Sequence, residues 1–370
     1  MKKSRSCWSA AVVAALTWAG ARAGAAETPA VRGIEVYSHR GGRSFNPENT
    51  LPAYRAALRL GTDWLDMDVV LTKDGEVLVS HDPVLNPDIA RDGEGRFLAL
   101  SREDLKAEPQ SQQDDYARKY VAKNLTLSEL KRFDVGRLNP DSAYAKLFPD
   151  QLPLDGTRMP TLREVVRWAD RITRRKVGFQ IEMKTDPAHP EFSADPKTLA
   201  AALDRILKEE GVLDRAEIQA FDFRCLQELR KLDPRARGAY LTSRENEPGG
   251  SDSFFAADAR QAGLWTGGKL VKDYGGSIPR MVKELGGFAW EPEDAELTRA
   301  ALDEAHALGL KVVVWTWPEK LGTSFDGPMV DRLIGWGVDG IITDDPGRLM
   351  SMLAARGLRV PPRYELPPGR

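Results

Sequence analysis

Short apolar runs alternate with longer amphipathic segments through most of this chain. The apolar runs predict strands at 33–38, 64–71, 177–183, 218–221, 238–242, 287–290, 311–317 and 340–343. Segments with apolar residues three and four positions apart predict helices at 50–60, 161–172, 196–210, 223–231, 278–285, 295–308, 329–336 and 346–355. The helix at 161–172 starts at Thr161, and Glu164 follows three residues later, which is the spacing of a capping box.

Eight strands that each precede a helix predict parallel pairing through right-handed crossovers. We therefore expect an α/β protein with a single (β/α)8 TIM barrel over residues 33–356 and a Pro-rich tail at 357–370. A doubly wound open sheet is the alternative. It is less favoured because the glycine-containing turn at 39–43 lacks the GxGxxG spacing of such folds.

One long stretch interrupts this alternation after the second strand. A tight turn leads into a short strand at 77–79, and the residues from about 83 to 159 are then rich in Asp, Pro, Gln and Gly. The convincing helical piece within them is 127–132. We expect a mostly irregular insertion that covers the mouth of the barrel, because loops of this length in compact domains are usually functional or disordered.

The N-terminus has the order of regions found in secretory signal peptides. Three basic residues within the first five precede an apolar run, and small residues follow as far as Ala26. The run is short for a membrane span of about 20 residues. We therefore predict a signal peptide at 1–26, no stable membrane insertion after cleavage, and a periplasmic or secreted protein, with a retained anchor as the alternative. Cleavage would remove Cys7 and leave Cys225 unpaired.

Composition narrows the possible functions. The chain is 42% hydrophobic, enough for a large core, and its 53 Lys and Arg against 55 Asp and Glu give a formal charge of −2. Loss of the four basic residues within 1–25 would change that charge to −6. Such a balance gives no electrostatic basis for nucleic-acid binding. Four histidines and two cysteines nearly exclude a metal site built from these two side chains.

Carboxylates gather at the predicted strand ends, where the catalytic groups of a barrel lie. Asp66 and Asp68 are two residues apart on one strand, so their side chains point to the same face. Glu182, at the same level of the next barrel strand, would complete a cluster of hard oxygen ligands suited to Ca²⁺ or Mg²⁺. The alternative is that Asp66 and Asp68 only form ion pairs with Arg40 and Lys184.

Two of the four histidines, His39 and His81, also fall at the predicted mouth. Phosphodiester cleavage requires a general base for the attacking hydroxyl and a general acid for the leaving alcohol, and histidine titrates in the suitable pH range. Beside an arginine, a lysine and three carboxylates, the two histidines indicate a catalytic site.

The order and spacing of these residues resemble the glycerophosphodiester phosphodiesterase family. The matching pieces span roughly residues 34–350: SHRGG (38–42), PENT (47–50), GTDWLDMDV (61–69), TKDG (72–75), HD (81–82), IEMK (181–184), WT (315–316) and GVDGIITD (337–344). The resemblance implies a TIM barrel, a divalent cation and a histidine pair. It also implies an enzyme that hydrolyses small glycerophosphodiesters to sn-glycerol 3-phosphate and an alcohol.

Carried over by position, the resemblance implies a role for each site residue. His39 would be the general base and His81 the general acid. The metal ligands would be Asp66, Asp68 and Glu182, although the family usually has Glu where this chain has Asp66. Arg40, Lys184 and Trp315 would bind the substrate and its phosphate, and Glu48 would orient Arg40.

Three alternatives stay open. The substrate could instead be a lipid, as for a lysophospholipase D or a phospholipase C-like enzyme, or the chain could bind phosphodiesters without cleaving them. The attacking group could be water or the glycerol 2-hydroxyl. Trp290, Trp315 and Trp317 could form an aromatic wall for a quaternary ammonium group such as choline, although Trp at strand ends is more often packing.

Overall fold

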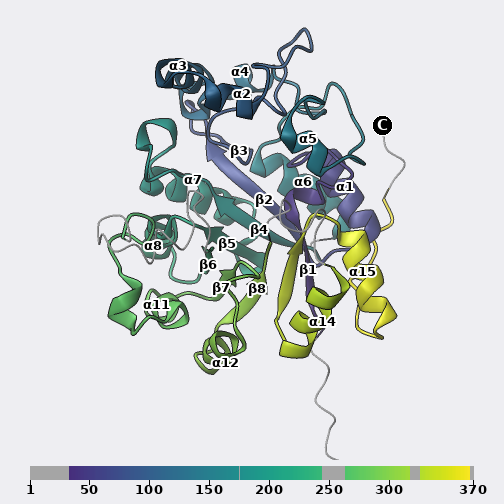
Figure 1. The fold of residues 1–370 in the computed structure, drawn as a ribbon, viewed down its shortest axis with the longest axis vertical. Helices are drawn as coiled ribbons and strands as arrows, with labels where there is room; N and C mark the ends of the chain where they lie inside the picture. The colour runs from purple at the N-terminus through teal and green to yellow at the C-terminus, as the bar shows by residue number, and fades with distance from the viewer. Residues whose placement is uncertain (1–32, 175, 244–262, 317–325, 367–370) are drawn as a thin grey trace, which may run out of the picture. The chain divides into compact units, whose positions relative to one another are not determined.

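The computed structural model describes residues 33–174, 176–243, 263–316 and 326–366. Within these residues eight parallel strands form a closed barrel, because β1 pairs with β9 on one side and with β2 on the other (Figure 1). The barrel strands are β1 (Glu35–Ser38), β2 (Trp64–Leu71), β4 (Gly178–Met183), β5 (Ala216–Ala220), β6 (Arg237–Thr242), β7 (Ala289–Pro292), β8 (Lys311–Val314) and β9 (Gly340–Thr343).

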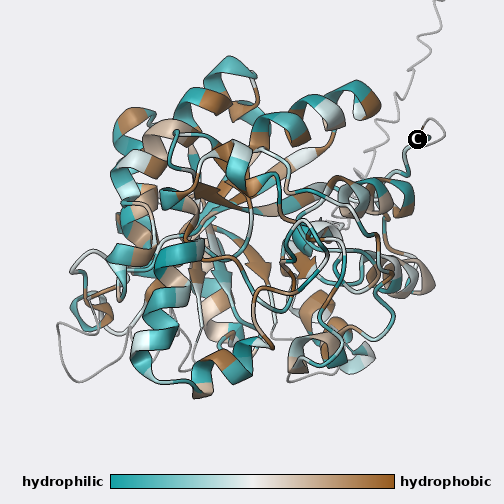
Figure 2. Ribbon diagram, turned by 90° about the horizontal axis from the view of Figure 1, so that it is seen from above, coloured by the Kyte–Doolittle hydropathy of each residue, from teal (hydrophilic) through white to brown (hydrophobic). Residues whose placement is uncertain are grey.

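A helix follows each barrel strand before the next one begins. The helices are α1 (Leu51–Leu60), α6 (Leu162–Thr173), α7 (Pro196–Glu209), α8 (Phe223–Leu232), α11 (Ile278–Glu284), α12 (Arg299–Ala307), α14 (Gly327–Trp336) and α15 (Pro346–Ala355). Figure 2 shows hydrophobic strands at the centre and hydrophilic turns on the surrounding helices. The predicted (β/α)8 barrel is confirmed, and the capping box of Thr161 and Glu164 is present at the start of α6.

The alternation of side chains along β2 explains how one strand serves both the core and the site. Leu65, Met67 and Val69 belong to the main hydrophobic core between the barrel and the helices. Successive side chains of a strand point to opposite faces, so Asp66 and Asp68 point into the barrel. Both carboxylates are almost completely buried.

Element boundaries differ from the prediction mainly around β7. The strand covers Ala289–Pro292 rather than 287–290, and the helix α12 begins at Arg299 rather than at 295. Thr298 caps α12 by accepting a hydrogen bond from the backbone N–H of Ala301. The residues between strand and helix form a turn, although their sequence contains good helix-forming residues.

The insertion, residues 83–159, follows β3 (Val77–Val79), which pairs antiparallel with β2. It contains α2 (Arg102–Ala107), α3 (Gln110–Tyr120), α4 (Leu127–Leu130) and α5 (Ala143–Leu147). Its buried apolar residues form a small second core with Val70 of β2 and Leu78 of β3. The prediction of a single helical piece was therefore wrong for α2, α3 and α5. None of these three helices has a fully buried residue, so they lack the apolar stripe that would have marked them in the sequence.

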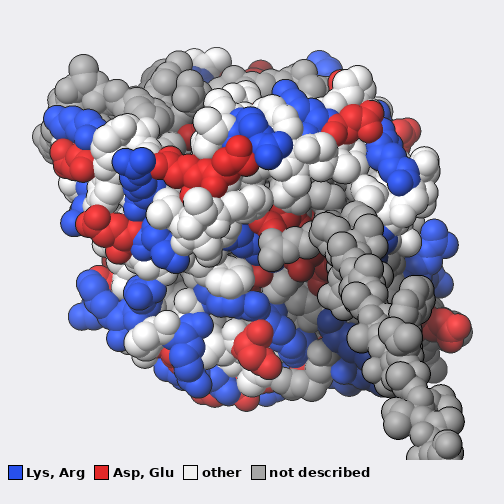
Figure 3. Space-filling view, turned by 90° about the horizontal axis from the view of Figure 1, so that it is seen from below, with Lys and Arg blue, Asp and Glu red and all other residues white. Residues whose placement is uncertain are grey.

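The predicted signal peptide lies outside the described residues and stays a prediction. Among the residues that are described, no helix has the length and apolar character needed to cross a membrane. Cys225 is buried and forms no disulfide. On the face shown in Figure 3, Lys and Arg side chains lie interspersed with Asp and Glu.

The end of the barrel opposite the mouth is closed by stacked aromatic rings and buried charges. The rings of Tyr37 and Trp64 stack with 5.4 Å between their centroids, and the Nζ atom of Lys311 lies 2.6 Å from Glu35 and 2.9 Å from Glu217. Trp64 is buried and its indole N–H donates to Glu35, so the ring is held by both stacking and a hydrogen bond.

Gly178→Ala should therefore destabilise the barrel. A β-carbon at residue 178 would lie 2.2 Å from the ring of Trp64, so we expect the free energy of unfolding to fall by about 2–3 kcal/mol. Urea unfolding followed by circular dichroism measures this change. Gly335→Ala is the matched control, because its β-carbon meets no atom within 4 Å and lies in a helix, where Ala should add about 0.5–1 kcal/mol. Equal stability of the two variants would contradict this packing.

Candidate active site

The mouth of the barrel brings together all eight polar or charged residues of the predicted site. In the register between β2 and β4, Asp68 lies opposite Glu182 and Asp66 lies opposite Gln180, so the carboxylates line neighbouring strands inside the barrel. His39 follows β1 directly and His81 follows the hairpin strand β3.

Each of two cations lies between a histidine and a carboxylate. The Nε atom of Arg40 is 3.3 Å from His39 Nε2 and 3.4 Å from Asp68 Oδ2. The Nζ atom of Lys184 is 3.1 Å from His81 Nε2 and 2.6 Å from Glu182 Oε1. Positive charge is thus concentrated beside both imidazole Nε2 atoms, where an anionic phosphodiester would be attracted.

The loop after β1 holds Arg40 in place at a cost in backbone strain. Arg40 and Asn49 both have positive φ angles, of 51° and 57°, and the Asn49 N–H donates to the Arg40 carbonyl oxygen. Asn49 also donates through Nδ2 to Asp68, at 2.8 Å, and accepts from the hydroxyl of Tyr54. Glu48 accepts from Arg40 at 2.9 Å. The strained loop therefore holds Arg40 beside the carboxylate of Asp68.

His39 is oriented by a carboxylate on the far side of its ring. Its Nδ1 atom lies 2.6 Å from Oδ1 of Asp344, which follows β9, and Arg43 donates to both oxygens of the same carboxylate. Although burial would raise the pKa of Asp344, Arg43 and His39 hold it well below its usual range. Burial, together with the charges of Arg43 and Arg40, lowers the pKa of His39, although Asp344 acts to raise it. The ring is therefore neutral near pH 7, with Nδ1–H donating to Asp344.

His81 has a similar arrangement. Its Nδ1 atom lies 3.2 Å from Oδ1 of Asp82, and its Nε2 atom faces Lys184. Burial, and then the charges of Arg40 and Lys184, lower the pKa of His81 to about 4. The Nε2 atoms of both histidines thus accept hydrogen bonds from cations in this structure.

The three carboxylates differ in how their charge is compensated. Burial and the nearby Asp68 and Glu182 raise the pKa of Asp66 well above its usual range, and burial raises that of Glu182 to about 7. Burial would raise the pKa of Asp68, but Arg40, His81, Lys184 and His39 together lower it. The Oδ2 atom of Asp66 is buried and makes no hydrogen bond with any described residue.

These residues suit a divalent cation by their chemistry. Three crowded carboxylates, two with raised pKa values and one with an unpaired oxygen, would be stabilised by a hard cation. In the described part of the chain, however, no three His, Cys, Asp or Glu side chains are arranged so that they could hold a metal ion. Arg40 pairs with Asp68 and Lys184 with Glu182, whereas neither pairs with Asp66, so the ion-pair alternative accounts for only part of the cluster.

The expected aromatic wall is only partly present. Trp290 belongs to the core between barrel and helices and donates to Thr242, so its predicted place in the wall was wrong. Trp317 lies outside the described residues. Trp315 does face the barrel interior, and Phe221 packs edge-on against it at 5.5 Å. Trp315 and Phe221 therefore form the aromatic side of the mouth.

Several residues of the site were given no role by the sequence analysis. Asp82, Asp344 and Asn49 lie in the matching pieces HD, GVDGIITD and PENT, and Arg43 lies in the turn at 39–43. Tyr144, from the insertion, donates to Glu48 and accepts from Arg43 at 2.8 Å. Its position depends on the folding of the insertion, whereas the PENT motif around Asn49 could have indicated the contact with Asp68.

Comparison with known proteins places the chain among enzymes that hydrolyse phosphodiesters. The model of the Glycerophosphoryl diester phosphodiesterase family matches residues 39–348, and the chain belongs to that family. A glycerophosphodiester phosphodiesterase of Caldanaerobacter subterraneus is 25% identical over 323 residues, which cover 87% of this chain and 98% of that protein.

Solved structures agree with this assignment. A Silicibacter pomeroyi protein, provisionally given the same activity, is 29% identical with a TM-score of 0.70, over 89% of this chain and 97% of its own. An Oleispira antarctica phosphodiesterase, solved with the product sn-glycerol-3-phosphate, has a TM-score of 0.57 at 18% identity, over 87% of this chain and 97% of its own. At 18% identity, the similarity to the Oleispira antarctica structure shows a shared fold.

Asp344→Asn should cost stability in a pH-dependent way. A carboxyl whose pKa is lowered by folding stabilises the protein above its unfolded pKa, near 3.9, and this contribution is lost as the pH falls below that value. We expect the variant to lose about 2–4 kcal/mol at pH 7, since Arg43 keeps a buried charge without its partner. The loss should shrink by about 1 kcal/mol at pH 3, where Asp344 of the folded wild type is still ionised.

Urea unfolding at pH 7, 5 and 3 measures this difference. Asp345→Asn is the matched control, because Asp345 caps α15 and Asn caps a helix equally well. A stability loss for Asp344→Asn that stays constant down to pH 3 would contradict the ion pair with Arg43.

Proposed function

We propose that this protein hydrolyses glycerophosphodiesters to sn-glycerol 3-phosphate and an alcohol, in a reaction that depends on a divalent cation, Ca²⁺ or Mg²⁺. The single observation that carries the proposal is the position of Arg40 and Lys184, each between a histidine and a carboxylate at the barrel mouth. This arrangement offers an anion site with a proton acceptor on either side. Membership of the family and the product complex of the Oleispira antarctica phosphodiesterase support the substrate class.

Arg40 and Lys184 would bind the phosphate and offset the negative charge that develops during the reaction. His39, neutral with Nδ1–H donated to Asp344, would take the proton from the attacking hydroxyl through Nε2. The new P–O bond forms as the bond to the leaving alcohol breaks, and His81 would give the alcohol its proton. Trp315 and Phe221 would pack against the apolar part of the substrate.

The role of His81 as the acid requires it to gain a proton. Its pKa is lowered by burial and by Arg40 and Lys184, and a bound phosphodiester brings a negative charge that offsets those two cations. Asp82, beside Nδ1, would stabilise the resulting imidazolium. Substrate binding and protonation of His81 are therefore coupled in this proposal.

The cation would be held by Asp66, Asp68 and Glu182. When bound, it would supply positive charge that polarises the phosphoryl group. Glu48 would act indirectly, because it accepts from Arg40 and so keeps the guanidinium directed at the mouth.

His39→Ala and His81→Ala should each lower kcat by at least about 100-fold, since general acid–base catalysis contributes about 10²–10⁴-fold. A coupled assay for glycerol 3-phosphate released from glycerophosphocholine measures this loss. His189→Ala is the control, because His189 is exposed and pairs only with Asp186 among the described residues. Full activity in either histidine variant would contradict the proposed role of that histidine as acid or base. Activity confined to lysophospholipid micelles would favour the lipid substrates instead.

Chelation followed by metal addition tests the cation separately. We expect protein dialysed against EDTA to lose activity, and calorimetry to show one bound Ca²⁺ or Mg²⁺ per chain with a raised melting temperature. Asp66→Asn should abolish this binding, whereas Asp303→Asn, on an exposed residue of α12, should leave it intact. Undiminished turnover after thorough chelation would exclude the cation from the reaction.

A further inference from the structure

The insertion reaches one of the two histidines through a chain of polar contacts. The Nη2 atom of Arg102, the first residue of α2, lies 2.7 Å from Oδ2 of Asp82. The other oxygen of Asp82 lies 3.2 Å from His81 Nδ1. His81 Nε2, on the opposite side of the ring, faces Lys184. The chain of contacts thus runs from the insertion, through a carboxylate, to the ring atom that faces away from the cation.

The backbone of Arg102 is held firmly. Its N–H donates to Oδ1 of the buried Asp88 at 2.8 Å, and the Ser101 side chain caps α2 by accepting from the N–H of Asp104. The carbonyl oxygen of Asp88 in turn accepts from the N–H of Asn139. The backbone of Arg102 is therefore fixed in position, although its side chain is 36% exposed.

The other histidine shows the same order of groups, built entirely from the barrel and its loops. There Arg43 contacts Asp344, and Asp344 contacts His39 Nδ1. In both cases an arginine holds a carboxylate that receives the Nδ1–H, which leaves Nε2 directed into the mouth. A carboxylate hydrogen-bonded to Nδ1 fixes both the tautomer and the orientation of an imidazole.

We propose that Arg102 is a positioning residue for His81, so that the insertion completes the proton-transfer site. The side chain of Asp82 is 20% exposed, so without Arg102 its carboxylate could turn toward solvent. Charge pairing with Arg102 and His81 outweighs burial and keeps the pKa of Asp82 well below its usual range, so it is always an acceptor at neutral pH. The catalytic part of this inference rests on the proposed function, whereas the structural part does not.

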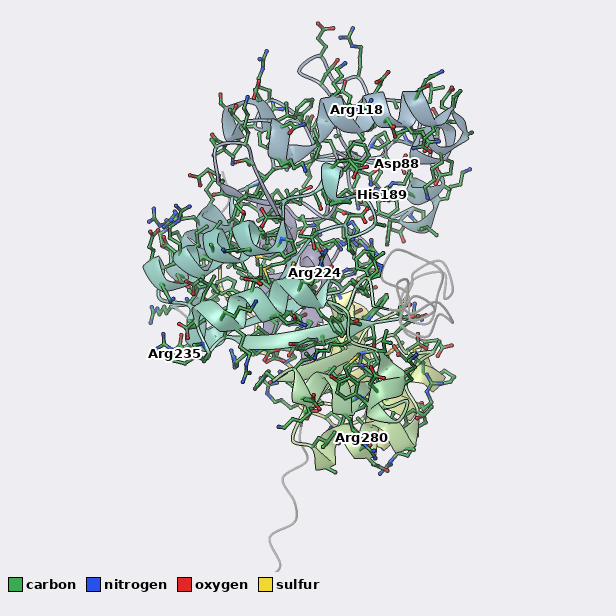
Figure 4. All side chains as sticks on the ribbon, turned by 90° about the vertical axis from the view of Figure 1, so that its left-hand side faces the viewer. Asp88, Arg118, His189, Arg224, Arg235 and Arg280 are labelled. Atoms are coloured by element: carbon green, nitrogen blue, oxygen red, sulfur yellow. The ribbon has the colours of Figure 1, made fainter. Side chains whose placement is uncertain are left out.

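Arg102→Gln removes the charge and Arg102→Lys keeps it. We expect Arg102→Gln to lower kcat about tenfold, with KM changed by less than about twofold, because a misplaced proton donor affects the reaction more than binding. Arg102→Lys should recover most of kcat. Arg118→Gln is the matched control: Arg118 lies on α3 of the same insertion, pairs with Asp114 and Asp115 of its own helix, and is seen in Figure 4 on the outer part of the insertion.

A second measurement does not depend on activity. In ¹⁵N-histidine NMR spectra at pH 7, with the signals assigned from a His81→Gln sample, wild-type His81 should be a single Nδ1–H tautomer. Arg102→Gln should give a mixture of tautomers at an unchanged melting temperature, and Arg118→Gln should match the wild type. If wild-type protein releases no glycerol 3-phosphate, the proposed function fails, but these spectra still decide the positioning role.

Unchanged tautomer populations in Arg102→Gln would overturn the inference. So would a loss of kcat that Arg102→Lys does not recover, or an equal loss in Arg118→Gln, since either would indicate a general effect on the insertion. A tenfold fall in kcat with a mixed His81 tautomer supports it.

Discussion

Buried negative charge is the constraint on which the rest of this site depends. The closed barrel carries Asp66, Asp68 and Glu182 on two neighbouring strands. Neighbouring negative charges are costly when they are buried, as these three carboxylates are. Arg40 and Lys184 compensate two of the three carboxylates. The positive φ angle of Arg40 and the hydrogen bonds of its loop follow from the need to hold a guanidinium at this point.

The same two cations determine how the histidines must be held. Because Arg40 and Lys184 face the Nε2 atoms, each ring can be fixed only from its Nδ1 side, away from the mouth. The carboxylate that holds His39, Asp344, is 305 residues away in the sequence. Asp82 is adjacent to His81 but depends on the insertion for its arginine. The orientation of the two histidine rings therefore depends on both the closure of the barrel and the folding of the insertion.

The periodic apolar pattern was sufficient to predict the barrel, since strands and helices with one buried face leave a clear signal. It also placed Asp66 and Asp68 on one face and the two histidines at strand ends. It could not predict α2 or the contact of Arg102 with Asp82, because α2 is held by polar contacts without an apolar stripe. The pairing of Arg43 with Asp344 likewise joins the loops after the first and the last barrel strand, which no local pattern records.

Asp66 and Asp68 show that a sequence motif can predict where a side chain lies but not its protonation behaviour. They are two residues apart and equally buried, yet the pKa of one is raised and that of the other lowered. Arg40 contacts Asp68 and, together with His81, Lys184 and His39, lowers its pKa. Burial and the charges of Asp68 and Glu182 raise the pKa of Asp66. Within the described part of the chain, Asp66 accepts one side-chain hydrogen bond, from Gln219 at 3.3 Å, and its Oδ2 atom accepts none. The barrel thus compensates one carboxylate with its own side chains and leaves an oxygen of its neighbour without a hydrogen bond among the described residues, and the proposed cation site depends on that oxygen.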